Sequence, residues 1–450
     1  MNVVFVDPPS PPGFQSFKNA HGGYGEMCLN GSLKVPTLDI FHSASLLLEK
    51  GFRASIVDSV LLDHSKEECV SAVSDKNPTM VAIRTASGSF LHDLEVAEAL
   101  KSKFNGPIVF YGPQVAREPD RILESSGVDA LVFGEATLTF LSICRKESFD
   151  GVPGVWFKEN GLITQNLQTS WIEDLDVLPI PRWDLVPYKK YSYVVTQTSW
   201  GCPFGCGYCP YPVTQGSRWR TRSIDHVVNE FKVLRNQYGL RFVLLLDPEF
   251  TLDRKRTVDL CEELIKRHTP IMWGCETRLD TLDEDLITLM AKAGCIRISF
   301  GVDTVNPETL HLMHRKEIPL ETIRERVTCI KKNGIVTYAF YMIGLPGETE
   351  QSTMDMIQFA LDLKTDVASF FMATPFYGTQ LEQWAHEHLI SYDNGLIHLT
   401  SCVPSMQNEH MDIQEIHRLY TLARTKWRQF KAKESRSLEE EGVLHLETSS

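Results

Sequence analysis

Three cysteines with the spacing of a cluster-binding loop are the strongest chemical signal in the sequence. They lie within eight residues, in Cys202-Pro-Phe-Gly-Cys206-Gly-Tyr-Cys209, and Gly201 and Gly205 suit the tight turns of such a loop. A cubane iron–sulfur cluster has four irons, so three thiolates leave one iron open for another ligand. A structural zinc site would need a fourth cysteine or histidine, and none lies within fifteen residues on either side.

Tyrosines and arginines around this loop are further candidates for chemistry. Tyr211 and Tyr377 would each serve as a proton or hydrogen donor near a radical, although a packed ring with a satisfied hydroxyl is the commoner role. Arg218, Arg220 and Arg222 follow the loop in alternate positions. They would form either an anion clamp for a redox partner or substrate, or a solvated entry into the next helix.

The composition restricts the classes of protein that fit. The chain has 450 residues, enough for two or three domains, and its net charge of -13 disfavours a nucleic-acid substrate. No stretch approaches the ~18 apolar residues of a membrane span, and the start does not resemble a signal peptide. Eleven cysteines, an odd number, argue against a disulfide framework. We therefore expect a cytoplasmic protein without a membrane span.

The elements that would position this chemistry begin with a Rossmann-like, doubly wound α/β domain over residues 1–145. Short apolar runs alternate there with helical patterns, which predicts a parallel sheet covered on both faces. Ligands of such domains bind at the carboxyl ends of the strands. The predicted strands cover residues 3–6, 54–58, 80–83, 107–112 and 130–135.

The second half predicts a different α/β architecture. Residues 146–193 carry several prolines and little periodicity, which indicates a linker. Residues 194–385 contain about six strand–helix units, too few for a closed eight-fold barrel, and predict a partial (β/α)6 barrel with its chemistry at the strand ends. Residues 386–450 predict a small, mostly helical C-terminal module, with a mobile tail over 439–450.

The cysteine spacing, with an aromatic residue before the third cysteine, resembles the signature of the radical S-adenosylmethionine (radical SAM) superfamily. The resemblance covers residues 194–385 and implies a [4Fe-4S] cluster on Cys202, Cys206 and Cys209, whose open iron chelates S-adenosyl-L-methionine. It also implies an electron donor such as flavodoxin or ferredoxin, and a 5′-deoxyadenosyl radical that removes hydrogen from a substrate carbon.

Motifs at the ends of the later strands strengthen this resemblance. One of them is Gly-Val-Asp-Thr at 301–304, where the family more often has Gly-Val-Glu-Ser, and another is Gly-Leu-Pro-Gly at 344–347. The resemblance implies that the cofactor is bound by Tyr208, Asp247, Glu249, Arg278, Asp303, Gly344 and Pro346.

The N-terminal half resembles the cobalamin (B12)-binding domain that is fused to many radical SAM proteins. The sequence has no Asp-x-His-x-x-Gly, so it offers no histidine as a lower ligand of cobalt, as in the radical SAM branch. Arg84 and the Tyr111-Gly112 pair depart from the usual small residues and would narrow the slot for the nucleotide tail. The resemblance implies that cobalamin is bound by Pro8, Ser87, Gly112, Gln114, Gly134 and Glu135.

Three functions from different classes remain open at this point. The first is cobalamin-dependent C-methylation of a small molecule by a radical SAM enzyme. The second is a cobalamin-independent radical SAM dehydratase, deoxygenase or cyclase that keeps the B12-type domain as a scaffold. The third is a non-catalytic corrinoid or cluster protein. A methylthiotransferase acting on tRNA is disfavoured, because no second three-cysteine set and no basic tail are present.

Overall fold

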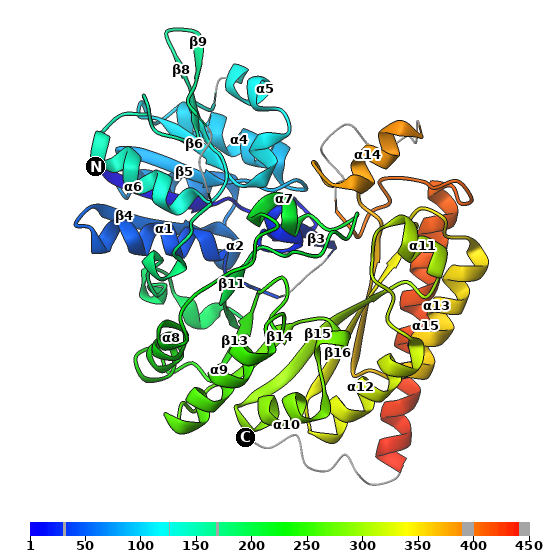
Figure 1. Cartoon of the computed structure of the whole chain (residues 1–450). Helices are drawn as coiled ribbons and strands as arrows, with labels where there is room; N and C mark the ends of the chain where they lie inside the picture. The colour runs from blue at the N-terminus through cyan, green and yellow to red at the C-terminus, as the bar shows by residue number, and fades with distance from the viewer. Residues whose placement is uncertain (30–32, 126, 168–170, 389–399, 441–450) are drawn as a thin grey trace.

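Two parallel sheets, one in each half of the chain, form the framework of the molecule (Figure 1). The structure is a computed structural model that describes residues 1–29, 33–125, 127–167, 171–388 and 400–440. The two sheets meet at α7 (Tyr211–Gln215), the helix that follows the cysteine loop. The junction between them therefore lies next to the cysteines.

The first sheet has the strand order β4-β1-β5-β6-β7-β8-β9, and its first five strands are parallel. These five strands are largely buried, apart from the first half of β4, because helices cover both faces. This confirms the predicted Rossmann-like sheet. Its strands are β1 (Asn2–Asp7), β4 (Arg53–Asp58), β5 (Met80–Arg84), β6 (Ile108–Tyr111) and β7 (Ala130–Val132), and its main helices are α1 (Leu38–Glu49), α3 (Lys66–Ser74), α4 (Phe90–Lys101), α5 (Pro119–Glu124) and α6 (Ala136–Lys146).

Two hairpins depart from the predicted layout of the first half. β8 (Val155–Glu159) and β9 (Leu162–Gln165) lie within the predicted linker, yet they extend the first sheet antiparallel to β7. A second hairpin, β2 (Phe14–Phe17) and β3 (Glu26–Leu29), occupies the long connection between β1 and α1. Between its strands lies the short helix η1 (His21–Gly23), which reaches the junction of the two halves.

The second sheet has six parallel strands in the order β10-β13-β14-β15-β16-β17, which confirms the predicted open (β/α)6 barrel. The small antiparallel pair β11 (Ser199–Trp200) and β12 (Arg220–Thr221) flanks the cysteine loop. The six strands are β10 (Val194–Thr196), β13 (Phe242–Leu245), β14 (Met272–Glu276), β15 (Cys295–Asp303), β16 (Val336–Ile343) and β17 (Val367–Met372), and the helices are α8 (Ile224–Asn236), α9 (Arg254–Lys266), α10 (Glu284–Lys292), α11 (Pro307–Leu312), α12 (Leu320–Lys332) and α13 (Glu350–Leu363).

The C-terminal region is helical, as predicted, and it packs on the barrel. It contains α14 (Gln380–Glu387) and the long helix α15 (Ile413–Glu440), which lies against α13 and β17. Residues 441–450 of the predicted mobile tail lie outside the described residues. In the part of the chain that the structure describes, no helix is both long and apolar enough to cross a membrane.

Candidate functional site

The cysteine loop is an irregular segment that backbone contacts hold in place. Gly201 has a φ of +78°, and a Cβ there would stand 2.2 Å from the carbonyl oxygen of Arg218, so this position requires glycine. Further along, the Gly207 amide donates to the carbonyl of Met313 at 2.7 Å. Gly205, by contrast, has open space where a Cβ would lie. The loop is therefore anchored at its start and its middle.

The three thiols are buried, and the Arg278 guanidinium acts on two of them. Burial raises the pKa of Cys202 and Cys206 to about 11, and Arg278 opposes both shifts. Burial also raises the pKa of Cys209. The Arg278 guanidinium lies 4.5 Å from the centre of the Phe204 ring in the same loop. Without further positive charge these groups stay thiols, so an iron cluster would supply the charge that stabilises thiolates.

Tyr208 and Asp303, two predicted cofactor residues, are brought into direct contact. The Tyr208 hydroxyl donates to Asp303 Oδ2 at 2.7 Å, and Arg315 Nε donates to the same oxygen at 2.8 Å. Burial raises the pKa of Asp303 to about 6, although the Tyr208 hydrogen bond works against that shift. The end of β15 is thus tied to the cysteine loop.

Two other predicted carboxylates are already engaged by the protein. Asp247 accepts from the amide of Thr198 at 2.7 Å, and from the hydroxyls of Thr198 and Ser199 at 2.6 Å each. It therefore positions the strand that enters the cysteine loop. Glu249 accepts from Thr281 Oγ1 at 3.2 Å and lies close enough to Cys202 to affect its pKa.

The predicted cofactor-binding turn at residues 344–347 is held by contacts within the turn and by the C-terminal region. Gly344 has a φ of +90°, and its amide donates to Glu348 at 2.8 Å. Asn408 donates to the carbonyl of Leu345 at 2.8 Å, directly before Pro346. These contacts fix the backbone of the turn that includes both predicted residues.

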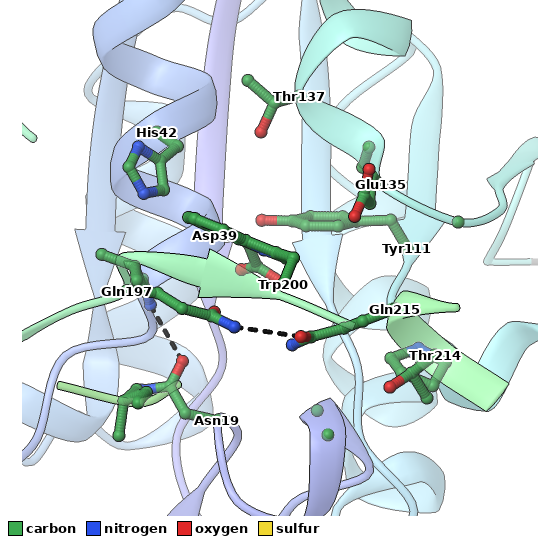
Figure 2. A pocket seen from close by; sticks show the side chains of 18 of the residues that line it. Asn19, Asp39, His42, Tyr111, Glu135, Thr137, Gln197, Trp200, Thr214 and Gln215 are labelled. Atoms are coloured by element: carbon green, nitrogen blue, oxygen red, sulfur yellow. Dashed lines mark hydrogen bonds between the residues drawn. The ribbon is translucent and has the colours of Figure 1, made fainter. Parts of the chain in front are cut away.

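A pocket with about 870 Å³ of empty space, including its open mouth, lies where the two halves meet. Gly112, Gly134 and Glu135, three residues predicted to bind cobalamin, line it at the strand ends of the first sheet, and Tyr211 lines it from α7. Figure 2 shows its two sides, with His42, Asp39, Tyr111, Glu135 and Thr137 facing Gln197, Trp200, Thr214 and Gln215.

Other predicted cofactor residues of the first half lie away from this pocket's lining. Ser87 donates to Gln114 at 2.8 Å, so these two buried side chains bind each other. Pro8 follows β1 and is also absent from the lining. Arg84 does line the pocket, where its Nε donates to Asp39 at 2.7 Å.

The three arginines after the cysteine loop do not form a free anion clamp, and only Arg218 is exposed to solvent. Each is paired with a carboxylate: Arg218 with Glu173 on the surface, and the buried Arg222 with Glu230. The buried Arg220 makes two hydrogen bonds of 2.7 and 2.9 Å with Glu135. Glu135 therefore joins the first sheet to β12, a role that sequence reasoning missed because the partners are far apart in the chain.

A histidine–glutamate pair in the unpredicted hairpin also reaches the site. His21 Nε2 lies 2.7 Å from Glu26 Oε2, and the Gly22 backbone packs against α7. Although burial alone would raise it, the pKa of Glu26 is lowered by His21, Ser401 and Thr400. Tyr377 lies nearby, and its carbonyl accepts from Tyr24 at 2.8 Å. A short glycine-rich stretch was the only sequence signal for this segment.

Comparison with known proteins assigns both halves of the chain. Residues 197–360 match the radical SAM superfamily, and residues 29–143 match the B12 binding domain. An uncharacterized methyltransferase from Pyrococcus horikoshii is 29% identical over 85% of this chain and 86% of its own. An anaerobic magnesium-protoporphyrin IX monomethyl ester cyclase from Rubrivivax gelatinosus is 28% identical over 92% and 75%. The fold is similar to the radical S-adenosylmethionine methyltransferase TsrM from Kitasatospora setae, solved with cobalamin and a 4Fe-4S cluster, with a TM-score of 0.70, 19% identity and coverage of 86% and 79%.

The chain is thus a radical SAM protein. More particularly, it is one that carries an N-terminal B12-binding domain in front of the radical SAM domain.

The residues present fit both groups that these domains imply. In the described part of the chain, no three His, Cys, Asp or Glu side chains converge as one metal ion would require. A cubane cluster makes no such demand, since each thiolate ligates its own iron. In the pocket, Asp39 Oδ1, His42 Nε2 and the Tyr111 hydroxyl are buried without a hydrogen-bond partner. A ligand rich in amides, such as cobalamin, would satisfy them.

Proposed function

We propose that the protein transfers a methyl group to a carbon of a small molecule, using a 4Fe-4S cluster, S-adenosylmethionine and cobalamin. The observation that carries this proposal is the shared pocket, because the helix after the cysteine loop and the strand ends of the B12-binding domain line the same space. When bound, the cluster with S-adenosylmethionine supplies the radical that removes hydrogen, and cobalamin supplies the methyl group.

The chain's own residues would hold and orient these groups. Cys202, Cys206 and Cys209 would bind the cluster, and the Tyr208–Asp303 hydrogen bond would keep the loop against the end of β15. Gly112, Gly134 and His42 would contact the corrinoid from the first sheet and α1. We propose residues 1–145 and 194–385 as the two units, with the β8–β9 hairpin as an extension of the first.

A small-molecule substrate is supported by the TsrM structure with tryptophan bound. A one-electron donor such as flavodoxin or ferredoxin would reduce the cluster. All eleven cysteines are free, which suits the reducing conditions of the cytoplasm.

A second candidate function is radical ring closure without use of cobalamin. The cyclase relatives support it, and so does Arg84, whose guanidinium lies 2.1 Å from the place of a Cβ on Gly112 and fills part of this strand edge. Retention of the corrinoid separates the two functions.

The test begins with anaerobic reconstitution of the cluster, addition of hydroxocobalamin and desalting. We expect a retained corrinoid band in the visible spectrum, and 5′-deoxyadenosine on addition of S-adenosylmethionine and a reductant. Absence of the band would overturn the methyltransferase proposal in favour of the second candidate. A Cys206→Ala variant that still cleaves S-adenosylmethionine would overturn the assignment of the cluster.

A further inference from the structure

The inner face of the second sheet is lined by aromatic rings that lie outside the pocket described above. Side chains of β16 alternate between buried and half-exposed. The buried ones, such as Ala339 and Tyr341, belong to the core that the outer helices cover. Tyr338 and Phe340 are half-exposed, and so is Phe371 on β17. These rings therefore face the open interior of the partial barrel.

The rings on this face form a continuous row that runs into the B12-binding half. The ring centres of Tyr338 and Phe340 are 5.1 Å apart, and those of Phe340 and Phe371 are 5.8 Å apart. Phe371 meets His21 at 5.9 Å, and His21 meets Phe376 at 5.1 Å. Such contacts are favourable both between protein rings and towards a bound apolar molecule.

The contacts between the rings limit the length of this row. Tyr338 and Phe371 are joined through Phe340 by the two steps of 5.1 and 5.8 Å, so their ring centres are at most about 11 Å apart. A molecule in contact with the whole row must be about that long.

Arg297 supplies a positive charge at the Tyr338 end of the row. The guanidinium carbon of Arg297 lies 4.3 Å from the centre of the Tyr338 ring, and its Nε donates to Ser299 at 3.1 Å. Among the residues described, no ion pair involves Arg297, in contrast to Arg278 and Arg315 beside the cysteine loop. The hydroxyl of Tyr193 also lies within hydrogen-bonding reach of this guanidinium, but it is a neutral partner, so the positive charge of Arg297 stays available for an oxyanion.

The nearest carboxylate on this face does not neutralise Arg297. Glu276 on β14 pairs with Ser299, whereas Arg297 pairs with Gly274. Glu276 therefore lies on the neighbouring strand, two residues closer to the carboxyl ends of the strands. Burial raises the pKa of Glu276 against the effect of Arg297. The Tyr338 end of the row therefore keeps a positive charge. Glu276 offers a hydrogen-bond acceptor further towards the carboxyl ends of the strands.

The opposite end of the row is where the two cofactor regions meet. His21 belongs to η1, in which Gly22 and Gly23 line the pocket of the B12-binding half. A Cβ on Gly22 would stand 2.6 Å from Thr214 Oγ1 on α7, directly after the cysteine loop. A carbon held at this end would lie between the radical source and the methyl source.

We propose that the substrate is an apolar, ring-bearing acid about 11 Å long or longer, whose oxyanion binds Arg297 and whose reacting end lies at His21. The rings of Tyr338, Phe340 and Phe371 contact its body. This rests on the proposed function and names its substrate class.

The test measures binding to the anaerobically reconstituted holoenzyme by equilibrium dialysis. The probes are 1-pyrenebutyrate, a ring-bearing carboxylate of suitable length, and its neutral isostere 1-pyrenebutanamide. We expect the acid to bind about tenfold more tightly than the amide or better, as one charge-assisted hydrogen-bonded pair would provide. Arg297→Gln should abolish this preference and leave amide binding unchanged, and Arg297→Lys should retain part of it.

The matched control is Arg324→Gln, which removes a guanidinium that lies 4.8 Å from Phe359 on the outer helices. It should keep the full preference for the acid. Equal binding of acid and amide, an undiminished preference in Arg297→Gln, or no binding of the acid up to about 1 mM would overturn the proposal. Corrinoid retention and 5′-deoxyadenosine formation, measured on the same samples, report separately on the proposed function.

Discussion

Tyr208 donates a 2.7 Å hydrogen bond to Asp303, across 95 residues of sequence, and so links the cysteine loop to the end of the fourth strand of the barrel. Because the acceptor is a buried carboxylate, we expect Tyr208→Phe to lower the free energy of unfolding by about 2 kcal/mol. Urea denaturation measures this change. Tyr188→Phe is the control, since its hydroxyl donates to a neutral carbonyl, and its loss should cost about 1 kcal/mol. Equal losses would contradict a charged acceptor.

The two glycines of the cysteine loop, Gly201 and Gly205, should respond differently to substitution by alanine. We expect Gly201→Ala to lower both the iron content after reconstitution and the melting temperature, because the new Cβ would meet the Arg218 carbonyl at 2.2 Å. A left-handed backbone adds about 1–2 kcal/mol for a non-glycine residue. Gly205→Ala has open space at its Cβ and should match the wild type in both measurements. Equal iron content in the two variants would show that the start of the loop is not a constraint.

The Glu135–Arg220 pair joins the two halves, with side-chain exposures of 11% and 2%. Glu135→Gln leaves a buried guanidinium without its counter-charge, so we expect a loss of about 3–5 kcal/mol in stability. The exposed pair Arg218–Glu173 is the natural comparison. Glu173→Gln should change stability by less than about 1 kcal/mol. A small effect of Glu135→Gln would mean that the halves are held together without this pair.

His42 gives a prediction for pH dependence. Burial and the nearby Arg222 lower the pKa of His42 to about 4, so the folded protein keeps it neutral. The unfolded chain takes up a proton below about 6.5. Stability should therefore fall as the pH drops from about 6.5 towards 4, by up to ~3 kcal/mol from this group.

The measurement is the difference in unfolding free energy between wild type and His42→Gln across that pH range. The wild type should lose stability relative to the variant as the pH falls. Parallel curves would contradict a neutral, buried His42.

The regular elements followed from the sequence, because alternating apolar runs and helical periodicity mark buried parallel strands and their crossovers. Strands β1 and β5 are strongly apolar, and they appeared at the positions predicted for residues 3–6 and 80–83. The β2–β3 hairpin was missed, since its strands are short and partly polar.

The role of the cysteine loop also followed from local spacing. The hydrogen-bond and ion-pair partners of the residues near the loop did not. Asp247 was predicted to face a cofactor, but its oxygens bind Thr198 and Ser199. Arg220 was expected to be an anion clamp or a solvated residue, but its partner Glu135 lies 85 positions earlier. Such pairings depend on how two sheets dock, which no local pattern records.

The β2–β3 hairpin is covalently part of the first domain, yet it presents His21 to the interior of the second. The boundary drawn along the chain is therefore not the boundary of the working unit. A recombinant chimaera that exchanged only the radical SAM domain would combine the barrel of one protein with the β2–β3 hairpin, including His21, of the other. Substrate range in such hybrids should follow the parent of residues 14–29 as well as the parent of the barrel.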